Sequence, residues 1–398
     1  MFKAVVVCAV IAVSLLGVIH ASDLILGNIL AGDRILHNQG YVGAGIPNQI
    51  ANRVVSYNGV YNITAIRAYD RSFNRTGAAS LTYGGLGYRN ASILVQGRSA
   101  GYGYDYLVEI YGLAMTENQL VEILPEDWPR LCALFRRNWP EHVFAYGLVS
   151  NYIKWKQQSS TETNVQIFSL NGTWPENGTF LLFDEFEIYF YSMDVESGYK
   201  SLSDALCLVK WEGYREVSMD FLEKHRAALD VAISAKSLFV AKDTLTNFYY
   251  KSKEVVAKDK VDLEGLRFDR VTVDQLDHIY NQWPLRTSIS QDSGYNLLKR
   301  LISLNESVGL FNTKDGSMLS WCLRDQTGAF SDLQTMETQL RKGYGRAVVS
   351  EFSRLLAVQG EDSYAFVLAS NERSCKLFES CGFTKVTHLH WVVVRQNG

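Results

Sequence analysis

The stretch of residues 339–347, QLRKGYGRA, decides the fold of the C-terminal part of this chain. Gly343 and Gly345 bracket a turn, and residues 348–356 then place apolar side chains on one face at a spacing near 3.6 residues. Such a glycine turn presents backbone N–H groups at the positive end of a helix, where a pyrophosphate can bind. The alternative is an ordinary strand-turn-helix connection with glycines at the turn.

The residues after this helix continue a regular pattern. Residues 363–368 predict a strand, and Asn371 lies at its end, in the capping region of a helix that runs through Phe378. Gly382 then ends this helix, and a final strand is predicted over residues 386–394. The C-terminal part therefore alternates strands and helices around the glycine turn.

The same alternation begins near residue 115. Period-3.6 patterns predict helices that begin at Leu120 and Glu126 and helices over residues 222–245, 276–280 and 293–304. Strands are predicted over residues 143–148, 165–170, 179–183, 308–312, 318–323 and 330–335. The result is an α/β (α+β) body with a mixed central sheet.

This order of elements resembles the GNAT acyltransferase superfamily, and four motifs are similar to its glycine N-acyltransferase branch. They are Asp325-Gln326-Thr327-Gly328, the NQWP of residues 281–284, the VGLF of residues 308–311, and Trp391. The resemblance spans residues 115–398. It implies a degenerate N-terminal GNAT-like domain over residues 115–265 and an acyl-CoA-binding catalytic domain over residues 266–398.

The resemblance also implies a site. Acyl-CoA would lie in a splayed gap between strands 330–335 and 363–368, and an amine would attack the thioester directly, with no metal. Binding the two reactants together and polarising the carbonyl would supply most of the rate. The implied acyl-CoA contacts are Leu333, Gln334, Thr335, Arg341, Lys342, Gly343, Tyr344, Gly345, Arg346, Asn371, Ser374 and Phe378.

Three positions depart from the family pattern. Leu340 stands where the family has Arg or Gln, although Gln339 and Arg341 flank it. Phe378 stands where many members have a tyrosine general acid, and Ala329 replaces the glutamate that acts as general base in glycine N-acyltransferases. A catalytically impaired member, or one with another acceptor, therefore stays open.

The sequence offers other candidates for the general base. Asp332 follows Ala329 by three residues, and Glu337 and His390 are further possibilities, each with an ordinary surface or strand role as the alternative. Cys375 and Cys381 have no visible partner base, which favours packing roles over nucleophilic catalysis.

The N-terminal part has a different character. Residues 1–21 carry Lys3, an apolar run and small residues near Ala21, which predicts a secretory signal peptide, with a membrane anchor as the alternative. Residues 22–112 are rich in Gly, Tyr, Asn and Ser, and their period-two runs predict a small antiparallel β-sandwich. Three glycosylation sequons fall between residues 62 and 92.

Residues 22–112 resemble the insect secreted-peptide family that is named for the second multiprotein bridging factor. The resemblance rests on Leu26-Gly27, the AGDR of residues 31–34, the ITAIR of residues 63–67, Gly84-Gly85 and the VEIYG of residues 108–112. It implies a small secreted β-protein. Neither a basic stripe nor a recognition helix for DNA is visible, and the net charge of -3 does not favour nucleic acid.

The junction and the cysteines suggest that the two parts of the chain belong to different cellular compartments. A helical pattern starts at once after Gly112, and Met115 could begin an independent protein. We therefore hypothesise that the gene model joins two adjacent genes. Five cysteines follow the predicted leader without regular spacing, which indicates a reducing compartment rather than a disulfide framework. The leader predicts secretion, whereas the body suits the cytosol or the mitochondrion.

Three functions follow from the sequence. The first is an acyl-CoA-dependent N-acyltransferase that acts on glycine or a similar small amine. The second is a secreted non-enzymatic β-protein whose C-terminal body is a silent passenger. The third is a body that binds acyl-CoA without transferring the acyl group.

Overall fold

The computed structural model describes residues 22–114, 118–158, 164–256, 263–287 and 290–396. The chain divides into two compact units, Met1–Asn118 and Gln119–Gly398, which we describe separately. The predicted signal peptide and the junction residues 115–117 lie outside the described residues. None of the described helices is long and apolar enough to span a membrane.

The first unit is the predicted all-β part, built from two antiparallel sheets. One sheet has the order β1-β4-β7-β2 and the other the order β3-β6-β5. The inward face of β7 carries Tyr104, Tyr106, Val108 and Ile110, all buried in the shared core. Its strands are β1 (Leu24–Gly27), β2 (Arg34–Gly43), β3 (Asn52–Asn58), β4 (Tyr61–Asp70), β5 (Gly77–Gly84), β6 (Asn90–Gly97) and β7 (Tyr104–Ala114).

The glycosylation sequons differ in accessibility from one another. Asn74 is exposed in the loop between β4 and β5, whereas Asn90 is buried. Asn171 and Asn305 of the second unit also begin Asn-X-Ser/Thr sequons, and both are buried, so the folded chain offers neither to a glycosylating enzyme.

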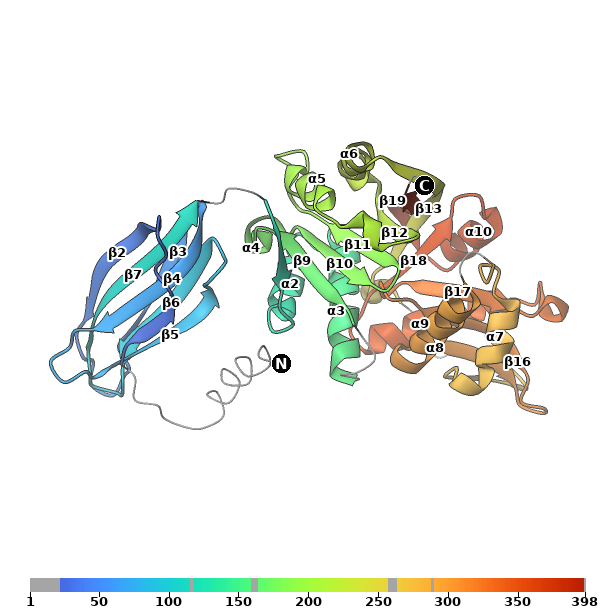
Figure 1. The fold of residues 1–398 in the computed structure, drawn as a ribbon. Coiled ribbons are helices and arrows are strands. Elements are labelled where there is room, and N and C mark those ends of the chain that lie inside the picture. The colour runs from blue at the N-terminus through green and yellow to red at the C-terminus, as the bar shows by residue number, and fades with distance from the viewer. Residues whose placement is uncertain (1–21, 115–117, 159–163, 257–262, 288–289, 397–398) are drawn as a thin grey trace, which may run out of the picture. The chain divides into compact units, whose positions relative to one another are not determined.

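The second unit is an α/β body around one twelve-stranded mixed sheet (Figure 1). The strand order is β14-β15-β16-β17-β18-β13-β19-β12-β11-β10-β9-β8. The strands are β8 (Leu120–Ile123), β9 (Gln166–Leu170), β10 (Phe180–Asp184), β11 (Glu187–Tyr191), β12 (Val217–Leu222), β13 (Leu238–Lys251), β14 (Leu266–Asp269), β15 (Val308–Asn312), β16 (Met318–Arg324), β17 (Phe330–Thr335), β18 (Ser363–Leu368) and β19 (Thr384–Gln396).

The helices repeat in the same order along both halves of this body. In the first half they are α2 (Trp128–Leu134), α3 (Val143–Gln158), the short α4 (Trp174–Asn177), α5 (Lys200–Cys207) and α6 (Arg226–Lys236). In the second half they are α7 (Leu276–Gln282), α8 (Gln291–Leu304), α9 (Tyr344–Val358) and α10 (Glu372–Ser380). Short 3-10 turns lie at Trp211–Gly213, Glu223–His225, Lys253–Val255, Val273–Gln275 and Glu337–Gln339.

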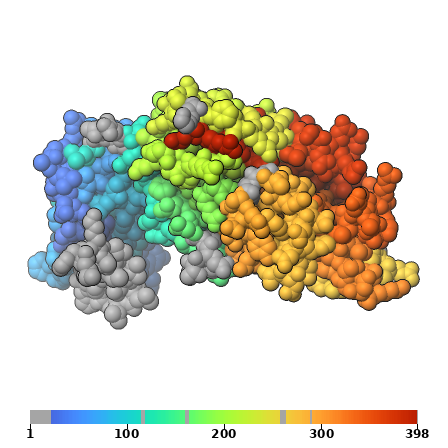
Figure 2. Space-filling view, turned by 45° about the vertical axis from the view of Figure 1, so that its right-hand side comes forward, coloured from blue at the N-terminus to red at the C-terminus, as the bar shows by residue number. Residues whose placement is uncertain are grey.

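The two halves exchange their last long strands. β13 belongs to the first half in sequence, yet it pairs antiparallel with β18, and β19 in turn pairs with β12. β13 and β19 also pair with each other along almost their whole length. In Figure 2 the dark-red C-terminal strand accordingly lies among yellow-green atoms of the first half.

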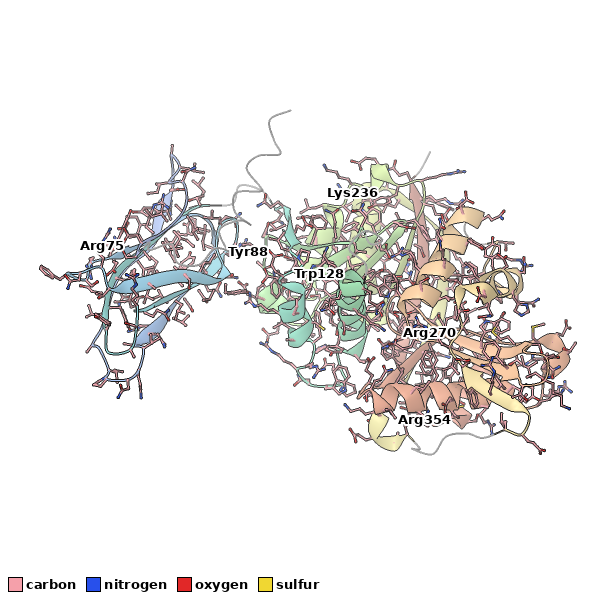
Figure 3. The ribbon with its side chains drawn as sticks, turned by 90° about the horizontal axis from the view of Figure 1, so that it is seen from below. Arg75, Tyr88, Trp128, Lys236, Arg270 and Arg354 are labelled. Carbon is pink, nitrogen blue, oxygen red and sulfur yellow. The ribbon has the colours of Figure 1, made fainter. Side chains whose placement is uncertain are left out.

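Helices cover the second half of the sheet on both sides. α9 and α10 pack over Leu310, Cys322 and Ala365. α7 and α8 pack over Trp321 and Leu323 on the opposite side. The guanidinium of Arg270 (Figure 3) donates to the carbonyls of Ile302, Ser303 and Asn305 at the C-terminal end of α8. This is the end of a helix where a cation is favourable.

Three sequence predictions were wrong. Residues 120–123 form β8 rather than a helix, and they pair with β9. Residues 143–148 begin α3, whose first turns are buried on nearly all sides, so that a continuous apolar run mimics a buried strand. The helix predicted over residues 222–245 ends at Ser237, whose φ of +51° breaks it before β13.

Candidate functional site

The loop before α9 presents free backbone donors. Gly343 has a φ of +82° and precedes the first helical residue, Tyr344. Within the described part of the chain, the amides of residues 341–346 donate to no acceptor, and the first bonded amide is Ala347 N–H to Gly343 O at 3.0 Å. The donors of the helix N-terminus are therefore available to an anion.

Cations surround these donors. Arg341, Lys342 and Arg346 are exposed, and none of them has a carboxylate partner among the described side chains. Lys342 Nζ donates to Gln339 Oε1 at 2.7 Å, which holds it beside the loop. A Cβ at Gly345 would approach Leu377 Cδ1 at 3.3 Å and Thr335 Oγ1 at 3.4 Å, so this glycine keeps the loop close to β17 and α10.

The equivalent loop of the first half lacks these properties. It precedes α5 and carries Asp194 and Glu196 instead of basic residues. Its amides are also occupied, since Tyr199 N–H donates to Asp194 O at 2.9 Å and Lys200 N–H donates to Ser197 Oγ at 3.1 Å. Of these two described loops, the loop before α9 alone combines free amides with positive charge.

β17 and β18 separate next to this loop. The two parallel strands pair only at Phe330 and Ala365, so the rest of β17 has no β18 partner. A register shift between β16 and β17 coincides with Asp332, whose φ is +48°. The bulge turns the backbone of residues 333–335 relative to a regular strand, as bulges do near functional sites.

The residues expected along the cofactor arm come from both sides of this gap, from β17 and from α10 after β18. The side chain of Asn371 caps α10 by accepting a hydrogen bond from Ser374 N–H at 3.1 Å. Thr335 Oγ1 lies 2.8 Å from Ser320 Oγ, and Gln334 Nε2 donates to Gln282 O at 2.9 Å. Phe378 is buried against Tyr249 and Phe383, whereas Leu333 is partly buried beside the same core.

A group of carboxylates gathers where the two halves of the sheet meet. Burial raises the pKa of Asp220 on β12 to about 7, and the nearby charge of Asp325 adds to this shift. Burial and the charge of Asp325 likewise raise the pKa of Asp332 to about 6. The pKa of Glu187 on β11 is also raised well above the ordinary value, mainly by burial and then by the charges of Asp184 and Asp220.

These carboxylates have different partners. Asp325 is committed to its own turn, because Oδ1 accepts from Thr327 N–H at 2.9 Å and Ala329 N–H at 3.1 Å. Glu187 Oε2 accepts from Gln326 Nε2 at 2.5 Å. Asp220 keeps partial solvent exposure and accepts no side-chain hydrogen bond from the described residues, which leaves it free to take a proton.

The sequence did not indicate Asp220 or Glu187 as site residues. They belong to the first half and lie near the turn of residues 325–328, Glu187 through its hydrogen bond to Gln326 and Asp220 within reach of the charge of Asp325. Of the other predicted candidates, Glu337 is exposed, and His390 Nδ1 lies 2.9 Å from Asp243 Oδ1. His390 stacks on Phe221, on the opposite face of the sheet from Asp220.

Cys375 and Cys381 occupy the core beside α10. Both are buried and free of disulfides. Burial raises the pKa of Cys381, which makes it a poor nucleophile.

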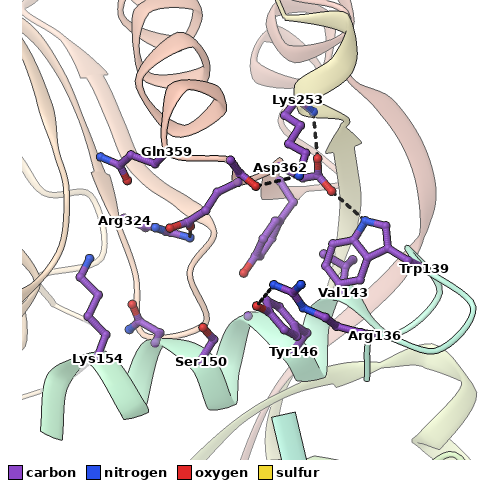
Figure 4. Close-up of a pocket in the computed structure, with 15 residues that line it drawn as sticks. Arg136, Trp139, Val143, Tyr146, Ser150, Lys154, Lys253, Arg324, Gln359 and Asp362 are labelled. Atoms are coloured by element: carbon purple, nitrogen blue, oxygen red, sulfur yellow. Dashed lines mark hydrogen bonds and ion pairs between the residues drawn. The ribbon is translucent and has the colours of Figure 1, made fainter. Parts of the chain in front are cut away.

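A separate cavity of about 500 Å³ lies between the first turns of α3 and the loop before β18 (Figure 4). Its charges are largely paired inside the protein. Arg324 is bound by Glu306 and Glu361, and Asp362 accepts from Trp139, Tyr250 and Lys253 N–H. No group of three or more metal-binding side chains was found among the described residues.

Two family models match parts of the chain. Residues 307–392 match the model described as FR47-like protein, and residues 26–112 match the model described as Transcription activator MBF2. The first match includes the loop before α9 and the splayed strands. None of the curated proteins matches the sequence.

Three solved structures are similar to part of the chain. A Drosophila protein solved by X-ray crystallography has a TM-score of 0.61 at 18% identity, covering 71% of this chain and 100% of that chain. A tandem GNAT protein from the clavulanic acid biosynthesis pathway has a TM-score of 0.45 at 11% identity, covering 70% and 98%. A GCN5-related N-acetyltransferase from Sphaerobacter thermophilus has a TM-score of 0.42 at 12% identity, covering 71% and 98%.

The structure bears out the predicted fold class: all-β sheets followed by an α/β body with a mixed central sheet. The comparisons do not single out the glycine N-acyltransferase branch.

Proposed function

We propose that the α/β body transfers an acyl group from acyl-CoA to the nitrogen of a small amine, such as glycine or a related acceptor. One observation carries this proposal: the unpaired amides and uncompensated cations at the N-terminus of α9 face a gap between two diverging strands. A diphosphate fits the first feature, and an extended pantetheine arm fits the second. The match to the FR47-like family model supports the same activity.

The chemistry assigned to the chain is simple. Backbone N–H groups near residues 333–335 would polarise the thioester carbonyl, and the amine would attack its carbon as the C–S bond breaks. Asp332 at the bulge and Asp220 on β12 are the candidate bases, because both have pKa values close to neutral pH. Acyl-CoA is the donor, and the mechanism invokes no metal.

Acyl-CoA binding without transfer is the second candidate. Ala329 is fully buried where the resembling enzymes have a glutamate, and Phe378 has no proton to donate. The first unit would then act as a secreted β-protein independently of the body.

The first experiment measures CoA binding by calorimetry in Gly343→Asp and Gly345→Asp variants of the full chain. A carboxylate at either position would repel the diphosphate, and we expect the affinity to fall at least tenfold. Gly316→Asp is the matched control, because Gly316 also has positive φ and open space but lies in a turn between β15 and β16. Equal binding by all three variants would remove the proposed diphosphate site.

The second experiment measures thiol release from acetyl-CoA and benzoyl-CoA with a panel of amines. Release that depends on the amine supports transfer. Tight CoA binding with no release for any amine would favour the second candidate.

A further inference from the structure

A cavity of about 490 Å³ lies on the first half of the sheet, away from the α9 loop. Side chains of β12, β13 and β19 line it, together with the start of α8. Ser218 on β12 is one of these side chains, and Asp220 follows it by two residues. Since side chains of a strand alternate, Ser218 and Asp220 point to the same face of the sheet.

The cavity contains more positive than negative charge. Arg395 is paired with Glu216 at 2.7 Å. Arg215 and Lys242 have no carboxylate partner within the described chain. Lys242 Nζ lies 3.5 Å from the centre of the Trp391 ring, which fixes the cation above an aromatic face. Two cations are therefore available to an anionic ligand.

Trp391 connects these cations to the carboxylate group. Its indole Nε1 donates to Ser218 Oγ at 2.9 Å, and Trp391 pairs directly with Asp220 across β12 and β19. The charge of Asp325 acts both on Asp220 and on Asp332, which lies beside the splayed strands. Trp391 thus joins the cations to Asp220, and Asp325 is close enough to both Asp220 and Asp332 for its charge to act on each.

We infer that this cavity binds the amine acceptor, and that the acceptor carries an anionic group several bonds from its nitrogen. The anion would lie on Arg215 and Lys242, and the amine would point toward Asp220. Lys242 Nζ lies above Trp391, and Trp391 is one strand spacing of about 5 Å from Asp220, so the two ends of the acceptor are separated by at least about that length. Glycine has only one carbon between its amine and its carboxylate and does not reach both ends.

The inference rests on the proposed function and specifies its acceptor. The amine nitrogen bonds to the thioester carbon, and the C–S bond breaks. The proton of the amine passes to the Asp220 carboxylate, and the CoA thiolate leaves and takes up a proton to become the free thiol.

The test compares kcat/KM for amines of matched length with the full chain and acetyl-CoA. The anionic series is glycine, 4-aminobutyrate and 5-aminopentanoate, and the neutral amines are butylamine and pentylamine. We expect the longer amino carboxylates to exceed both glycine and the neutral amines by about tenfold or more.

Two variants then assign the anion site. Lys242→Met and Arg215→Met should each lower the preference for 5-aminopentanoate over pentylamine about tenfold, mostly through KM. Lys236→Met, in the last turn of α6 outside the cavity, is the control and should keep the wild-type preference. CoA affinity measured in each variant verifies that the body is folded.

The outcomes separate the two proposals. Equal use of neutral and anionic amines, or an unchanged preference in both cavity variants, would overturn the inference while the transferase remains. CoA binding without transfer to any amine would overturn the transferase and the inference with it.

Discussion

Asp220 has the properties of a general base at the scale of a single residue. It lies on a strand of the first half, yet the charge of Asp325 in the second half acts on it. Burial and that charge raise its pKa to about 7, so its carboxylate can accept a proton near neutral pH. Asp332 has a similar pKa but occupies the strained bulge position.

Replacing Asp220 should lower the rate of transfer and raise the stability of the folded protein at pH 8. Its pKa is higher in the folded than in the unfolded protein, so the wild-type loses up to about 1.4 kcal/mol per pH unit between pH 4 and 7 through this group. Asp220→Asn removes this loss, and we expect a higher melting temperature at pH 8 with little change at pH 4. The rate of transfer should fall about a hundredfold or more.

Calorimetry and a pH–rate profile check this prediction. The wild-type rate should rise as the pH increases through about 7, because only the ionised carboxylate accepts a proton. Asp332→Asn is the matched variant. If it abolishes the rise near pH 7 and Asp220→Asn does not, Asp332 is the base.

At the scale of elements, α5 and α9 occupy equivalent positions and differ in their N-termini. Gly343 and the basic residues around it leave the amides of α9 open. Ser197 and Asp194 satisfy the donors before α5 and add negative charge. Of these two equivalent helix N-termini, that of α9 has the free amides and positive charge that favour an anion, whereas that of α5 does not.

This difference predicts one CoA molecule for each chain. Calorimetric titration should give a stoichiometry of one, and Arg346→Glu should weaken binding about tenfold or more. Lys200→Glu at the start of α5 is the matched control and should bind CoA like the wild-type. A stoichiometry of two would contradict this reading of the α5 loop.

At the scale of the whole molecule, the exchange of β13 and β19 joins the halves of the body into one sheet. Each half without the other would leave β12 or β18 without its neighbouring strand. Exposed edges of this kind are poorly tolerated. The predicted boundary between residues 115–265 and 266–398 therefore does not divide the body into two separate sheets, because strands on each side of it pair with strands on the other side.

Fragments of the body test the exchange of β13 and β19 directly. We expect residues 119–256 and 263–398 to be unfolded or aggregated when each is produced alone, and to recover CoA binding when they are produced together. Circular dichroism and calorimetry measure the two properties. A folded, CoA-binding fragment 263–398 would contradict the prediction, and the chain without residues 1–118 is the control that should bind CoA normally.

The sequence by itself determined the local features of this protein. Gly343 and Gly345, the helix after them and the cap at Asn371 are short-range patterns, and the alternating runs of the first unit are equally local. These signals specified the glycine loop before α9 and both fold classes. Residues 120–123 and 143–148 were misassigned because a short or fully buried apolar run lacks the period that separates helix from strand.

Only the tertiary structure decided which residues from the two halves meet. Asp220 and Asp332 are more than a hundred residues apart, and nothing local in the sequence relates a strand of one half to a bulge in the other. The exchange of β13 and β19 joins the strands of both carboxylates into one sheet, and burial together with the charge of Asp325 raises the pKa of each. Pairing between distant strands depends on the whole hydrogen-bonded sheet, whereas the glycine turn depends only on its own backbone.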